Sequence, residues 1–88
     1  MERFRGRLMD GDRVLLDEIE GSIAIKEGPG VQEWRGRFWL PESSPVQPGG
    51  RYCLIRDDGR AGELIVESSG PDATGVQVAV FEGNSRFE

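Results

Sequence analysis

Apolar and polar side chains alternate along most of this chain, and this period of two restricts its fold more than any other feature. The alternation is clear where Trp34 and Phe38 alternate with Arg35 and Arg37. A strand turns successive side chains to opposite faces, so the pattern places one set in a core and the other in solvent. It predicts β-strands around 4–9, 14–17, 23–25, 34–40, 52–55, 64–67 and 76–81.

Residues that favour turns separate these runs. Gly and Asp tolerate the positive φ angles of tight turns, and Pro cannot continue a central strand. We therefore predict turns at Asp10-Gly11, Glu20-Gly21, Gly28-Pro29-Gly30, Asp58-Gly59 and Gly70-Pro71-Asp72. The longest irregular segment is a Pro/Ser/Gly-rich loop at 41–50. No stretch shows the apolar spacing of an amphipathic helix.

The expected fold is all-β. A chain of 88 residues is long enough for one small core and too short for two. Closing the sheet is the best protection for strand edges in so short a chain. We predict a single domain over 1–88, a small antiparallel barrel or barrel-like sandwich of six to seven short strands with essentially no helix.

The residue inventory argues against catalysis and metal binding. The chain has no His and one Cys, so no Ser-His-Asp triad, Cys-His pair, zinc site or disulfide framework is available within it. Asp10-Gly11-Asp12 begins like a calcium loop, but Val14 occupies a position that needs a ligand. We expect no enzymatic activity, no metal and no cofactor.

The charge balance narrows the range of partners. The net charge is −5, which opposes binding to the phosphate backbone of DNA or RNA. The longest purely apolar run, 78–81, is far shorter than a membrane span, and no signal-like segment follows the charged start of the sequence. A lone Cys53 on a strand fits a reducing compartment, so we expect a cytoplasmic protein without membrane association.

A sequence echo identifies a candidate binding surface. The segment 4–9, Phe-Arg-Gly-Arg-Leu-Met, is echoed at 34–39 as Trp-Arg-Gly-Arg-Phe-Trp. If the two strands are neighbours, their outward residues share one surface. These candidate binding residues are Arg5, Arg7, Arg35, Arg37 and Trp39. The echo also has a purely structural explanation, because a Gly inside a strand often marks a bend or a close approach of two backbones.

Two interpretations of these candidate arginines remain open. They can pair with acidic residues on adjacent strands, such as Asp17, Glu33, Glu63 and Glu67. Alternatively, arginine forks and an exposed Trp39 can bind a protein partner, which makes the chain a non-enzymatic interaction module. An anion- or nucleotide-binding module that uses the same arginines is the alternative function.

Two further patterns bear on association. Trp34 and Trp39 have opposite parity, so a regular strand buries only one of them. A bulge can re-aim one ring, Trp39 can be exposed, or it can pack under the loop 41–50. The hairpin 51–67 is apolar on both faces, which is typical of strands covered on both sides. The second cover can be the loop 41–50, the segment with Phe81 and Phe87, or a second copy of the chain in a homodimer.

Overall fold

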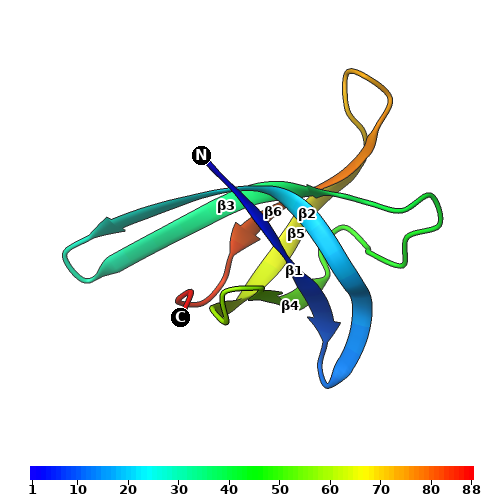
Figure 1. Cartoon of the computed structure of the whole chain (residues 1–88). Helices are drawn as coiled ribbons and strands as arrows, with labels where there is room; N and C mark the ends of the chain where they lie inside the picture. Colours follow the sequence, from blue (N-terminus) through cyan, green and yellow to red (C-terminus); the bar gives the residue numbers. More distant parts are fainter.

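Six antiparallel strands close into a barrel without a helix, which confirms the predicted fold class (Figure 1). The computed structural model describes the backbone of residues 1–88 and every side chain except that of Val31. The strands are β1 (Glu2–Asp10), β2 (Arg13–Gly28), β3 (Val31–Trp39), β4 (Arg51–Arg56), β5 (Ala61–Pro71) and β6 (Gln77–Gly83). Around the barrel their order is β1-β2-β3-β6-β5-β4, and β1 pairs with β4 to close it. No helix in the described chain is long and apolar enough to cross a membrane.

The predicted turn at Glu20-Gly21 is wrong. The expected strands at 14–17 and 23–25 are parts of one strand, β2, which runs unbroken past Gly21. Gly21 is needed for a different reason, because a Cβ atom on it would lie 1.9 Å from the carbonyl oxygen of Arg37. The glycine therefore permits a close approach of β2 to β3 and does not reverse the chain.

The predicted turns at Asp10-Gly11, Gly28-Pro29-Gly30 and Asp58-Gly59 are confirmed. Gly11, Gly30 and Gly59 have φ angles of 63°, 72° and 91°, a region that side chains disfavour. Gly70 and Pro71 still belong to β5, and the turn begins only at Asp72. The chain between β3 and β4 forms the irregular loop. Turn chemistry is readable from the sequence here because each of these glycines adopts its conformation for a local reason.

Alternation sorts the side chains as expected. Trp34 and Phe38 are buried in the barrel, whereas Arg35 and Arg37 are exposed on its outside. The ring of Phe81 lies near the centre of the core, 5.8–6.2 Å from three other aromatic rings. The buried cluster comprises Phe4, Leu8, Ile19, Ile23, Trp34, Phe38, Val46, Tyr52, Leu54, Leu64, Val66, Ala79, Phe81 and Phe87.

Two irregular segments close the ends of the barrel. The 41–50 loop adds Val46 to the core near the start of β4, where the Gly49 amide donates to the Val66 carbonyl at 2.7 Å. The segment 84–88 adds Phe87 at the other end of the barrel, beside the start of β5. On the outer side of the 51–67 hairpin, Cys53, Ile55 and Ile65 are half-buried, whereas Arg51, Glu63 and Glu67 are exposed. Homodimerisation through this face remains a prediction.

The Arg-Gly-Arg echo has a structural cause. A Cβ atom on Gly6 would lie 2.3 Å from the carbonyl oxygen of Ile55, and one on Gly36 would lie 2.0 Å from that of Ser22. Both glycines thus sit where a neighbouring strand approaches too closely for a side chain. The shared pattern follows from two strands meeting the same packing constraint.

Candidate functional site

The two strands that carry the candidate arginines are not neighbours, because β2 lies between them. Successive hairpins connect β1, β2 and β3, so β1 and β3 flank the middle strand. Arg3 of β1 and Arg37 of β3 both pair with Ser22 of β2, one from each side. The expected direct adjacency is therefore replaced by a three-strand surface with β2 at its centre.

Trp39 is exposed on this surface. It is 39% exposed at the end of β3, while Trp34 is 2% exposed. Of the two tryptophans on β3, Trp34 is therefore the buried one and Trp39 points outward. The guanidinium carbon of Arg3 lies 5.4 Å from the centroid of the Trp39 ring, within the range of a cation–π contact. Arg3 therefore reaches across β2 and joins the outer faces of β1 and β3.

A cleft of about 250 Å³ lies at this junction. Its lining residues are Arg3, Phe4, Arg5, Glu20, Gly21, Trp39, Arg56 and Asp57. We call the surface formed by Arg3, Arg5, Arg37 and Trp39 the Arg–Trp face. It contains three of the five predicted binding residues together with Arg3, which sequence reasoning missed.

The signal for Arg3 is present in the sequence. Arg3 has the same parity as Arg5 and Arg7, and β1 begins at Glu2. The predicted strand begins at Phe4, so Arg3 is not among the residues expected to face outward. Strand ends are the least certain part of a pattern-based prediction.

Arg5 and Arg7 form ion pairs with carboxylates of β2, which is the first of the two interpretations given above. Arg5 Nη2 lies 2.7 Å from Glu20 Oε1, and Arg7 Nη2 lies 3.5 Å from Asp17 Oδ1. All four side chains are at least 41% exposed, and ion pairs this open to water contribute little to stability. The pairing therefore orients the guanidinium groups without making them inaccessible to a ligand.

Arg7 and Arg35 lie at opposite ends of the surface. Arg7 lines a second cleft together with the carboxylates of Asp17, Glu18 and Asp57, which neutralise its surroundings. Arg35 pairs in register with Ala24, farther along the β2–β3 ladder from Trp39. The structure thus groups Arg5, Arg37 and Trp39 and places the other two predicted residues at the margins.

Several arginines of the surface have no carboxylate partner. Among the residues the structure describes, Arg3, Arg35 and Arg37 form no ion pair. Arg35 and Arg37 also line a shallow depression beside the 37% exposed Val80. Carboxylates lie near these arginines as well, because Glu20 and Asp57 line the first cleft and Glu67 lines the depression.

The described side chains contain no group of three or more His, Cys, Asp or Glu residues arranged to hold a metal ion. In the comparisons with known proteins, no family model, no curated protein and no solved structure matches this chain. The geometry of the Arg–Trp face is therefore the basis on which a function can be assigned.

Proposed function

We propose that this protein is a non-enzymatic interaction module that binds an acidic segment of a protein partner on the Arg–Trp face. One observation carries the proposal: Trp39 stays 39% exposed with Arg3 against its ring. Exposed tryptophans and arginines are the residue types most enriched among the dominant contacts of protein interfaces.

The mechanism divides between the two residue types. A docked partner removes the Trp39 ring from water, which supplies apolar contact area. Arg3 and Arg37 then bind carboxylates of the partner in forked hydrogen bonds. Glu20, which already pairs with Arg5, repels acidic groups that dock out of register.

The open surroundings of Trp39 favour a protein over an enclosed small molecule. Two clefts of about 250 and 400 Å³ adjoin Trp39, but its indole stays 39% exposed, whereas pockets for small ligands enclose most of the ligand surface. An anion or a nucleotide held by the same arginines is the second candidate, supported by the unpaired guanidinium groups of Arg3 and Arg37. Its phosphates would take the place of the partner's carboxylates.

The first test is capture of partners from host lysate, followed by calorimetric titration of the partner identified. The double variant Arg3→Glu with Trp39→Ala should weaken binding by at least about 2 kcal/mol, or roughly 30-fold in Kd. Arg35→Glu with Arg37→Glu should weaken it as well. Arg13→Glu is the matched control, because it reverses an exposed charge on β2 outside the cleft. Equal binding by all of these variants would rule out the Arg–Trp face.

A second titration separates the two candidates. Inorganic phosphate and nucleotides are added to the protein while its amide NMR signals are recorded. Saturable shifts confined to Arg3, Arg37 and Trp39 favour the anion-binding alternative. No shift with any of these probes, together with a partner that binds in the capture experiment, favours the interaction module.

A further inference from the structure

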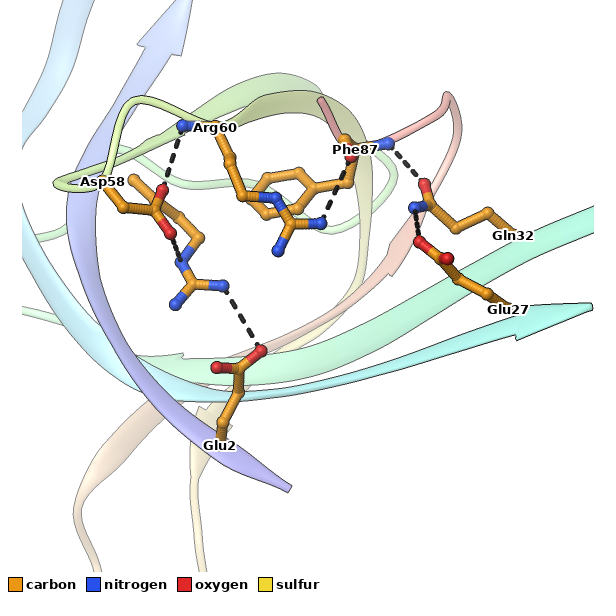
Figure 2. Close-up of polar contacts among 7 residues, drawn as sticks. Glu2, Glu27, Gln32, Asp58, Arg60 and Phe87 are labelled. Atoms are coloured by element: carbon orange, nitrogen blue, oxygen red, sulfur yellow. Dashed lines mark hydrogen bonds and ion pairs between the residues drawn. The ribbon is translucent and has the colours of Figure 1, made fainter.

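The end of the barrel beside the start of β5 is occupied by the chain's own segment 84–88, which we call the tail (Figure 2). Phe87 is only 2% exposed there, although the tail itself has no assigned strand or helix. The contacts that hold this segment differ in kind from the strand ladders elsewhere in the barrel.

The ring of Phe87 lies in a pocket built by other parts of the chain. Its centroid is 4.8 Å from that of the Trp34 ring. The guanidinium carbons of Arg60 and Arg56 lie 4.9 and 5.9 Å from it, so two cations face its π system. The pocket therefore offers one aromatic wall and two positive groups to a flat, electron-rich ring.

A glycine keeps the pocket open. A Cβ atom on Gly62 would lie 2.8 Å from atoms of both the Phe87 and the Trp34 rings. Any larger residue at this position would force one ring to move. The absence of a side chain at this position of β5 thus leaves room for both rings.

Several of the remaining contacts are to the main chain of the tail, while the side chains of Asn84 and Ser85 form hydrogen bonds with Glu63. The amides and carbonyls of Ala61 and Glu88 exchange two hydrogen bonds, as neighbouring strands do. The Trp34 indole Nε1 donates to the Ser85 carbonyl at 2.7 Å. The Phe87 amide donates to Gln32 Oε1. Main-chain contacts of this kind recognise an extended peptide, whatever most of its side chains are.

Figure 2 shows that Gln32 and Arg60, which lie beside Phe87, also form hydrogen bonds with residues outside the tail. Glu27 Oε1 accepts a hydrogen bond from Gln32 Nε2 at 2.8 Å, which turns the other amide atom of Gln32 toward the tail. Asp58 Oδ1 accepts from the Arg60 amide at 3.0 Å. The donors and acceptors of the groove are therefore held by partners outside the tail.

We propose that this barrel end is a peptide-binding groove, and that the tail is its tethered occupant. Its other occupant is an extended segment of a partner protein that inserts one Phe side chain between Trp34 and Arg60. Tethering gives the tail an effective concentration on the order of millimolar. The groove is therefore closed to weak competitors and opens to a partner when the tail is released. Arg56 lines the cleft of the Arg–Trp face as well as the Phe87 pocket. Phe87 and Trp39 can be replaced separately, so either proposal can fail alone.

The test uses the full chain with Phe87→Ala, which empties the aromatic pocket and leaves the groove residues unchanged. The probe is an acetylated synthetic peptide with the tail sequence Asn-Ser-Arg-Phe-Glu. We expect saturable shifts of the Ala61 and Gln32 signals and of the Trp34 indole N–H. A control peptide with Ala in place of Phe should bind at least about tenfold more weakly, and wild type should resist the probe by a similar factor.

Three results would overturn the proposal. The first is a folded variant that shows no saturable shift at millimolar peptide. The second is equal binding of the two peptides. The third is a dimer formed by wild type and lost in Phe87→Ala, which would identify the second occupant as the tail of another copy. If circular dichroism shows that Phe87→Ala is unfolded, a spin-labelled peptide is added to wild type. Broadening confined to the Trp34 indole and Ala61 then supports the groove, and its absence refutes it.

Discussion

Single glycines decide whether neighbouring strands can meet. Replacing Gly21 by Ala puts a Cβ atom 1.9 Å from a backbone oxygen of β3, which a side-chain rotation cannot relieve. We expect Gly21→Ala to cost about 3 kcal/mol of stability or more. Urea unfolding followed by circular dichroism measures the loss.

Gly28→Ala is the matched control on the same strand. Nothing lies within 4 Å of its added Cβ atom, and its backbone conformation suits a side chain. Its stability should change by less than about 1 kcal/mol. Equal losses in the two variants would show that the close approach at Gly21 relaxes easily.

Asp72 makes the turn after β5 sensitive to acid. The Thr74 hydroxyl donates to Asp72 Oδ1 at 2.6 Å, and the amides of Thr74 and Val76 donate to the same oxygen. Chiefly because of the Thr74 hydroxyl, the pKa of Asp72 lies below its ordinary value of 3.8. The ionised carboxylate thus stabilises the fold at pH values above 3.8, and this contribution is lost as the pH falls through the lower, folded-state pKa.

Asp72→Ala should therefore lower stability at neutral pH, and its difference from wild type should disappear in strong acid. Urea unfolding at a series of pH values measures this convergence. Thr74→Val removes the largest cause of the shift, so it should reproduce part of the effect. A constant difference between Asp72→Ala and wild type at every pH would show that the carboxylate charge has no part in it.

The orientation of individual residues was predictable wherever the cause was local. Strand parity alone predicts that Arg35 and Arg37 face outward, as the structure shows. It does not predict whether the loop 41–50 covers Trp39, which the structure leaves 39% exposed. The error at Gly21 has the opposite origin. A glycine in a turn and a glycine under an approaching strand look alike in sequence, and only the distant partner distinguishes them.

At the scale of elements, the β2–β3 hairpin extends beyond the barrel (Figure 1). Its outer part, with Glu27 paired to Gln32, contains exposed residues, whereas Ile19 and Ile23 of the same strand are buried. Opening the tip exposes little apolar surface, so its amides should exchange with solvent faster than those at the buried end. Hydrogen exchange followed by NMR compares Glu27 with Ile23, and equal protection would mean that the hairpin opens only with the barrel.

The arrangement of elements was less predictable than their existence. The runs of alternation located every strand, but they do not say which strands pair. The candidate face depended on that pairing, because β2 intervenes between Arg5 and Arg37. Arg3 became visible as a site residue only through its contact with Trp39 across the middle strand.

At the scale of the whole molecule, the β1–β4 pairing closes the barrel, so association within the closed part has to use a face. The outward side of the 51–67 hairpin carries half-buried Cys53, Ile55 and Ile65, which favours packing against a second copy. We expect sedimentation to show a dimer at high concentration and Ile55→Lys to weaken it by burying a charge at the contact. A wild-type protein that stays monomeric throughout would exclude this homodimer.

The contrasting surroundings of Trp34 and Trp39 give the molecule two intrinsic optical reporters. The fluorescence of the buried Trp34 comes from an apolar environment. Trp39 is accessible to dissolved iodide, which the neighbouring Arg3 guanidinium attracts. Quenching can therefore distinguish an event at the outer wall from one at the barrel end without any added label.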